Sequence, residues 1–215
     1  MNRVGPPWHL QGSGSILLFR FEPGFLERDA CLPEALRDRL AGRLGLVMLV
    51  DYDESPVGPY WELLFLAGPF QWEGRRSFCI TRIYVSTEAS AVNGRGNWGI
   101  PKEVADFAVE RRGRTEHVHV TLDGRTVADL TVGIGRPPLP VTATVLPRSW
   151  RTLVQPWEGR TFVITLEGRG VVRPARLLKA RIEPELFPDL TRGRLLAATQ
   201  ASRFRLIFPE PKVIE

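Results

Sequence analysis

The sequence predicts a mainly β fold with a few short helices, built from antiparallel strands as a barrel or sandwich. Three observations support this class. Short runs rich in β-branched and aromatic residues recur along the chain, and the 20 glycines and 18 prolines are scattered between them as turn residues. Residues 107–134 alternate apolar and polar side chains around one tight turn. At 215 residues, with no long linker, the chain is expected to form a single domain over 1–215.

The first half of the chain is expected to contain four strands and two helices. Leu36, Leu40 and Leu44 recur every fourth residue, and Pro33 suits a first helical turn, so the pattern favours a helix between the first two strands. One short helix is expected between Thr87 and Gly99, followed by a glycine-rich loop. The expected strands are 16–22, 44–52, 60–66 and 78–86.

The second half is expected to consist mainly of hairpins. Asp123-Gly124 supplies a tight turn between two alternating strands. Further strands are expected at 161–167, 171–183 and 203–208, with an amphipathic helix near 190–199. The whole chain is therefore expected to contain about ten strands and two or three helices.

Composition and charge narrow the class of protein. The net charge of +5 raises nucleic acid as a partner. The arginines are spread evenly, however, and no cluster of aromatic residues offers a base-stacking face, so nucleic acid is not expected. Cys31 and Cys79 are too few for a disulfide framework, and both are expected in the core. With no signal-peptide pattern and no apolar stretch of membrane-spanning length, a cytoplasmic protein without a membrane partner is expected.

Lys102 stands out because nearly all the basic residues of this chain are arginine. Of 29 basic residues only Lys102, Lys179 and Lys212 are lysine. Lys102 ends the stretch GRGNWGIPK, and unlike arginine it can lose its proton and attack a carbonyl group. To be largely neutral near pH 7 it needs its pKa lowered by about 3.4 units from the free value, or roughly 4.6 kcal/mol. Burial or a nearby cation can supply such a shift, whereas a solvated loop lysine needs neither.

The stretch at residues 94–102 resembles the active-site motif of the acetoacetate decarboxylase superfamily, in which Gly-Arg, a short variable run and Pro-Lys precede a strand. The resemblance places the Schiff-base lysine of that family on Lys102. The segment Gly58–Glu62 looks like the family's Gly-x-x-Tyr-x-Glu segment, with Glu62 as its carboxylate, and residues 203–215 are similar to its closing strand and tail. The resemblance implies a cone-shaped antiparallel β-barrel, a homo-oligomer and catalysis without a metal or organic cofactor.

The sequence also departs from this family at three places. A second lysine that lowers the pKa of the nucleophile is replaced by Glu103. The N-terminal active-site arginine falls near residues 12–15, where the chain reads GSGS and Arg20 is not equivalent. A second glutamate falls near Val47. These departures weaken acetoacetate as the substrate more than they weaken carbonyl chemistry at Lys102.

The remaining candidate residues have two interpretations each. Glu62 is either a general acid/base or the partner of an arginine. Arg95 either clamps a substrate carboxylate or binds local carbonyls. Trp98, Pro101 and Tyr60 form either a pocket wall or ordinary packing. No metal site is expected, because the two strand histidines 117 and 119 have no third ligand at a suggestive spacing.

Two functions follow as hypotheses. The first is a lyase-like enzyme that forms a Schiff base between Lys102 and a small oxo acid or other carbonyl compound, and then catalyses decarboxylation, aldol or dehydration chemistry. The second is a non-catalytic β-barrel protein that binds a small apolar or carbonyl ligand. An enzyme requires a neutral Lys102 near pH 7, whereas a binding protein can leave it charged.

Overall fold

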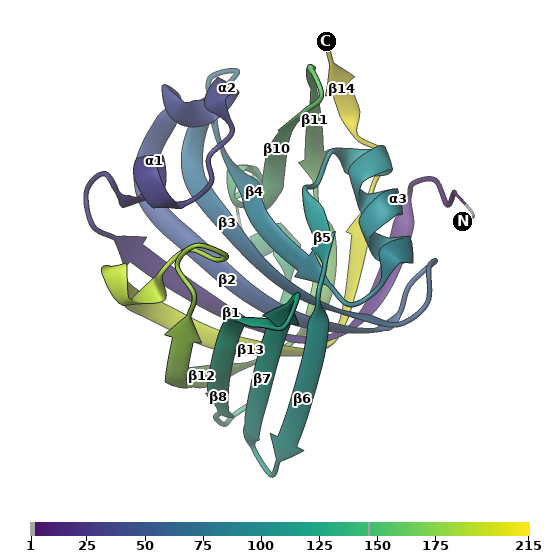
Figure 1. The fold of residues 1–215 in the computed structure, drawn as a ribbon. Helices are drawn as coiled ribbons and strands as arrows, with labels where there is room; N and C mark the ends of the chain where they lie inside the picture. The colour runs from purple at the N-terminus through teal and green to yellow at the C-terminus, as the bar shows by residue number, and fades with distance from the viewer. Residues whose placement is uncertain (1–2, 146) are drawn as a thin grey trace.

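A computed structural model describes residues 3–145 and 147–215 (Figure 1). The helices are α1 (Phe25–Asp29), α2 (Glu34–Arg37) and α3 (Glu88–Trp98). The strands are β1 (Trp8–Phe21), β2 (Leu40–Glu54), β3 (Tyr60–Trp72), β4 (Arg75–Val85), β5 (Lys102–Val104), β6 (Asp106–Arg112), β7 (Thr115–Leu122), β8 (Arg125–Ile134), β9 (Leu139–Thr142), β10 (Thr152–Trp157), β11 (Arg160–Thr165), β12 (Glu167–Ile182), β13 (Gly193–Phe208) and β14 (Lys212–Ile214). The predicted mainly β class is confirmed.

All the strands join one sheet. Its order is β14-β11-β10-β4-β3-β2-β1-β13-β12-β8-β7-β6, with β5 paired to β4 and β9 paired to β12. Neighbours are antiparallel except for β10 with β4 and β4 with β5, which run parallel. The long central strands curve strongly (Figure 1). In the described residues the order runs from β14 at one edge to β6 at the other, so the expected barrel is not closed by strand pairing.

The curved sheet carries a hydrophobic core on each face. Alternate residues of one strand point to opposite faces, so Leu63 and Phe65 enter one core while Leu64 and Leu66 enter the other. Core 1 contains the buried residues of α1 and α2. Core 2 contains Trp98 of α3, and the candidate site lies in it.

The helix expected through Leu36, Leu40 and Leu44 is wrong beyond its first turn. Only α2 is helical there, and β2 begins at Leu40, opposite Phe70 of β3. The register of β2 against β3 shifts between Leu40 and Leu44. Leu40 therefore packs against core 1, whereas Leu44 packs against core 2. A short amphipathic helix is marginal by itself, and pairing with β3 outweighs its local preference.

The helix expected near 190–199 is also wrong. A single 3₁₀ turn, η3 (Leu190–Arg192), precedes β13, which pairs with β1 on one side and β12 on the other. Leu195 and Ala197, good helix formers, face Phe19 and Leu18 across the β1 ladder. Long-range hydrogen bonding on both edges therefore overrides helix propensity.

Two smaller expectations also change. Cys79 is buried as expected, but Cys31 is exposed, because it lies in the connection between α1 and α2 and not in a strand. Most of the glycine-rich stretch expected as a loop is helical, since α3 extends to Trp98. Within the residues described, no helix is both long and apolar enough to cross a membrane.

Candidate active site

The alternation of β2 and β3 builds one wall of the site. Tyr60, Glu62 and Leu64 occupy every second position of β3 and face core 2, opposite Tyr52 and Met48 of β2. Glu62 is only 4% exposed. Its place in the strand therefore directs the Glu62 carboxylate into the interior.

The opposite wall comes from α3 and the short strand that follows it. The hydroxyl of Thr87 accepts a hydrogen bond from the Ser90 backbone N–H at the start of α3. Gly99 ends the helix in the left-handed conformation that glycine tolerates best, with φ 63°. The chain then enters β5, where Lys102 pairs with Ile83 of β4. This turn directs the Lys102 side chain into core 2.

The Gly-Arg part of the motif holds this lysine in place. A Cβ on Gly94 would lie 2.6 Å from Cδ of Lys102, so the lysine stem packs directly on the bare backbone of α3. Nη1 of Arg95 donates a hydrogen bond to the backbone carbonyl of Lys102, and Nη2 lies 3.6 Å from Oε1 of Glu88. Arg95 therefore binds a local carbonyl, the second of its two interpretations.

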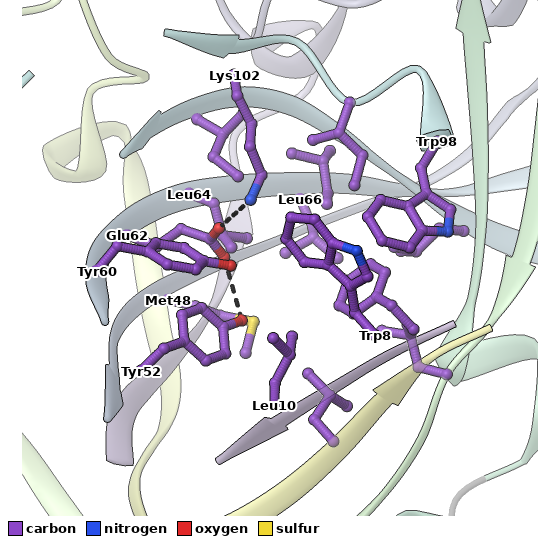
Figure 2. Close-up of a pocket in the computed structure, with 17 residues that line it drawn as sticks. Trp8, Leu10, Met48, Tyr52, Tyr60, Glu62, Leu64, Leu66, Trp98 and Lys102 are labelled. Carbon is purple, nitrogen blue, oxygen red and sulfur yellow. Dashed lines mark hydrogen bonds and ion pairs between the residues drawn. The ribbon is translucent and has the colours of Figure 1, made fainter. Parts of the chain in front are cut away.

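Lys102 meets Glu62 in the interior. Nζ donates a hydrogen bond to Oε2 of Glu62 (Figure 2), with a length of 2.8 Å. Nζ also donates to Oγ of Ser90 at 3.0 Å. It also lies 5.0 Å from the centre of the Tyr60 ring, within cation–π range. The Tyr52 hydroxyl donates to the other carboxylate oxygen, Oε1, at 3.4 Å. The result is a buried ion pair with hydrogen-bond partners on both sides.

The electrostatics of this pair follow from its burial. Burial by itself lowers the pKa of Lys102, but the Glu62 carboxylate and Tyr60 raise it by more, so the pKa lies above its ordinary value of 10.5. Burial also raises the pKa of Tyr60 to about 12 against the opposing effect of Lys102. Burial and the charge of Glu62 raise the pKa of Tyr52. At neutral pH the site therefore holds an ammonium, a carboxylate partner and two phenolic O–H groups.

Glu103 takes no part in this cluster. Successive strand residues point apart, and its Oε1 lies 2.8 Å from Nη1 of Arg82 on the other face. The Glu103 carboxylate therefore does not face the Lys102 amine, which it would otherwise hold in the charged form. The carboxylate that stabilises the charged form of Lys102 is that of Glu62, which reaches Nζ from β3.

A small apolar cavity opens beside Lys102. Its volume is about 60 Å³. Figure 2 shows Trp8 and Trp98 on one side of it. Their ring centres are 5.1 Å apart in an edge-to-face arrangement. The lining residues are Trp8, Leu10, Met48, Tyr52, Tyr60, Glu62, Leu64, Leu66, Ile80, Ile83, Trp98, Ile100, Lys102, Leu153, Leu166, Leu206 and Phe208.

The structure separates the predicted site residues into two groups. Lys102, Glu62, Tyr60 and Trp98 line the cavity, whereas Arg95 and Pro101 do not. Trp98 also anchors the C-terminal segment, because its Nε1 donates to the Pro209 carbonyl at 2.8 Å.

Sequence reasoning missed three contributors: Ser90, Tyr52 and Trp8. Tyr52 had a signal, because it ends the strand expected at 44–52 and lies opposite Tyr60 of β3. Ser90 lies 12 residues before Lys102, and no spacing rule connects a helix hydroxyl to a strand amine. Trp8 comes from the far end of the chain, where only the fold could bring it.

The positions of the missing family residues are also clear. Val47 faces core 1, and Met48 stands on the cavity side of β2. A Cβ on Gly12 would collide with the Asp51 carbonyl, and one on Gly14 would lie 2.5 Å from the Leu49 carbonyl oxygen. This stretch of β1 is pressed against β2 and leaves no room for a long side chain at either glycine.

His117 and His119 flank Asp129 on the outer strands β7 and β8. Nε2 of His117 lies 2.9 Å from Oδ1 of Asp129, and both histidines are about one-third exposed, at 38% and 35%. Among the described residues no group of three or more histidine, cysteine or acidic side chains is arranged to hold a metal ion.

Fold and site together define a mainly β protein whose cavity contains a buried lysine–glutamate pair. A family model described as acetoacetate decarboxylase (ADC) matches residues 10–166. The chain belongs to the acetoacetate decarboxylase family.

Two solved structures and one curated relative extend this comparison. An acetoacetate decarboxylase from Legionella pneumophila superposes with a TM-score of 0.75 at 16% identity, covering 100% of this chain and 90% of that one. The enduracididine biosynthesis enzyme MppR, in complex with pyruvate, gives a TM-score of 0.68 at 14% identity, covering 99% and 91%. The protein NEOXANTHIN-DEFICIENT 1 of Solanum lycopersicum is 31% identical over 108 residues, or 48% of this chain and 35% of the relative. The match thus spans about a third of that relative's length.

Proposed function

We propose that this protein is a lyase-like enzyme that forms a Schiff base between Lys102 and a small carbonyl compound, with Glu62 as the group that moves protons. The observation that carries the proposal is the 2.8 Å contact between the lysine Nζ and Oε2 of Glu62 at the wall of an apolar cavity. A nucleophile within hydrogen-bond reach of a base is the arrangement that covalent catalysis needs.

The raised pKa of Lys102 sets how the reaction begins. Little free amine is present while the pair is charged. Because the donor and acceptor already share a hydrogen bond, the proton can pass from Nζ to Glu62 without leaving the site. The pair, and not Lys102 alone, is therefore the reactive unit.

The remaining steps use the same two residues. The free amine adds to the carbonyl carbon to give a carbinolamine, and protonated Glu62 returns its proton as the hydroxyl leaves as water. The product is a protonated imine beside the Glu62 carboxylate. At neutral pH the phenols of Tyr52 and Tyr60 keep their protons, because their pKa values are raised. Their hydroxyls can therefore donate hydrogen bonds to the substrate carbonyl oxygen before Lys102 attacks.

Comparison with the neighbouring structures supports a carbonyl ligand, since MppR has been captured with pyruvate, a 2-oxo acid. The alternative is a protein that binds a small apolar or carbonyl ligand without turnover. The observation that favours it is the same raised pKa, because a lysine held as an ammonium is not a nucleophile.

Borohydride trapping distinguishes the two. The protein is incubated with carbonyl compounds between pH 5 and 9, reduced, and mapped by mass spectrometry. The chain offers its own control, because Lys179 and Lys212 are the other lysines and both are well exposed, at 60% and 66%. An adduct on Lys102 that forms faster than on these two supports the enzyme. Labelling of the exposed lysines alone supports the binding protein.

A variant control must not leave one buried charge unpaired. We therefore choose Lys102→Met together with Glu62→Gln, which replaces the ion pair by neutral side chains of similar size. This double variant is expected to stay folded and to lose the adduct. Circular dichroism and the urea midpoint check the fold.

A further inference from the structure

The charges in the cavity already neutralise each other. Of the described residues that line it, Lys102 is the only cation and Glu62 the only anion. The other lining side chains are aromatic, aliphatic or thioether, apart from the phenolic hydroxyls of Tyr52 and Tyr60. A substrate carboxylate would enter as a third charge, without a cation of its own and close to Glu62. Removing such a group from water is costly unless it is paired.

Two arginines adjoin the cavity through its backbone, and both are engaged there. Nη1 of Arg95 donates to the Lys102 carbonyl, and Nη1 of Arg151 donates to the Leu166 carbonyl at 3.1 Å. Neither side chain lines the cavity. Gly12 and Gly14 cannot carry a side chain without moving β2. The described surroundings therefore provide no cation for a substrate carboxylate.

We infer that the cavity takes a small uncharged carbonyl compound, a ketone or an aldehyde, and not an oxo acid. This inference rests on the proposed Schiff base at Lys102 and deepens it. Decarboxylation requires a carboxylate on the substrate, so it is excluded here. The chemistry left to the imine is loss of a proton from the carbon next to it.

The size of the cavity limits the substrate further. A water needs roughly 10–15 Å³ of such space, so about 60 Å³ admits about four to six non-hydrogen atoms without rearrangement. A ketone of about five carbons matches this space. Larger carbonyl compounds require movement of the Trp8 and Trp98 side chains.

The proton transfers balance without any other reactant. The ammonium of Lys102 and the ketone together give the protonated imine and one water. The Glu62 carboxylate carries a proton between the steps and is a carboxylate again at the end. Glu62 then removes a proton from the α-carbon, the C–H electrons form the enamine double bond, and the imine nitrogen is neutralised. Return of a proton and hydrolysis regenerate the ketone. In D₂O the returned proton is deuterium, so each cycle leaves a label on the α-carbon.

The test compares 2-pentanone with 4-oxopentanoate, which share the methyl ketone and the five-carbon chain. Because 4-oxopentanoate also has two more oxygen atoms, 5-methyl-2-hexanone, in which an uncharged isopropyl group replaces the carboxylate, is the size-matched control. Two rates are measured with the full protein: borohydride labelling of Lys102, and α-deuteration by NMR. We expect 2-pentanone to react at least about tenfold faster by both measures. Acetoacetate is expected to release no CO₂ above the rate in buffer. The Glu62→Gln variant should narrow the labelling difference, because it removes the repelling carboxylate.

The outcomes separate the two proposals. If neither ketone labels Lys102, the Schiff base itself is wrong. Equal or faster labelling by 4-oxopentanoate overturns the uncharged substrate alone, and would mean that Arg95 or Arg151 turns into the cavity. Labelling by 2-pentanone without α-deuteration overturns the assignment of the reaction to the α-carbon.

Discussion

The Nζ atom of Lys102 lies 2.8 Å from Oε2 of Glu62, although 40 residues separate them in the chain. Two adjacent ladders bring them together. Ile83 of β4 pairs with Leu64 on one side and with Lys102 on the other, and Glu62 is two residues from Leu64 on the same face. The reactive pair is therefore a product of strand register.

Removing one member of this pair is expected to cost more stability than removing both. Glu62→Gln leaves a buried ammonium without its counter-charge, and such changes typically cost about 3–5 kcal/mol. Burial then lowers the pKa of Lys102, so the loss should shrink as pH rises. Urea unfolding at pH 7 and pH 9 measures it. The Lys102→Met/Glu62→Gln variant is the control and should lose less; a larger loss in the double variant would contradict the ion-pair account.

Adding a methyl group at Gly94 is expected to disturb Lys102. The new Cβ would lie 2.6 Å from Cδ and 2.9 Å from Cε of the lysine. Gly94→Ala should destabilise the fold by roughly 1–3 kcal/mol through overpacking and slow labelling of Lys102. Gly96→Ala is a matched control in the same helix, since nothing lies within 4 Å of its Cβ. That variant should be neutral, or more stable by up to about 1 kcal/mol. Similar results from both variants would refute the role assigned to Gly94.

Arg95 is expected to act through the backbone of Lys102 and not on the substrate. Arg95→Met removes the hydrogen bond to the Lys102 carbonyl and the ion pair with Glu88. Labelling by 2-pentanone and by 4-oxopentanoate should then fall by the same factor. A selective loss of 4-oxopentanoate labelling would instead show that Arg95 clamps a carboxylate.

Stability is expected to fall above pH 10. The stabilising effect of protonated Lys102 is fully present below its ordinary pKa of 10.5 and is lost as pH rises through its higher folded value. Tyr60 also lowers stability as pH rises, because the pKa of its phenol is 10.0 in the unfolded chain but about 12 in the folded protein. The Tyr60 contribution to this loss is at most about 3 kcal/mol. Urea midpoints between pH 8 and 12 measure the fall, and the Tyr60→Phe variant should show a shallower one.

Much of the architecture could be predicted from local patterns. The hairpin at Asp123-Gly124 appears where the turn residues indicate it, between β7 and β8. The two helix predictions were wrong where strand pairing between distant segments outweighed the local preference for a helix. Leu40 and the 193–199 segment have helix-forming sequences, yet both join β ladders with distant partners.

The candidate site divides in the same way. The sequence by itself determined that Lys102 is the exceptional basic residue and that Tyr60 and Glu62 share one strand face, because the alternation of a strand is local. Only the tertiary structure decided that Ser90, Tyr52 and Trp8 join them, that Glu103 turns to Arg82, and that Arg95 binds a backbone carbonyl outside the cavity. These contacts depend on how β3, β4, β5 and α3 are placed against one another, and that placement is set by hydrogen-bond ladders and cores that connect distant parts of the chain.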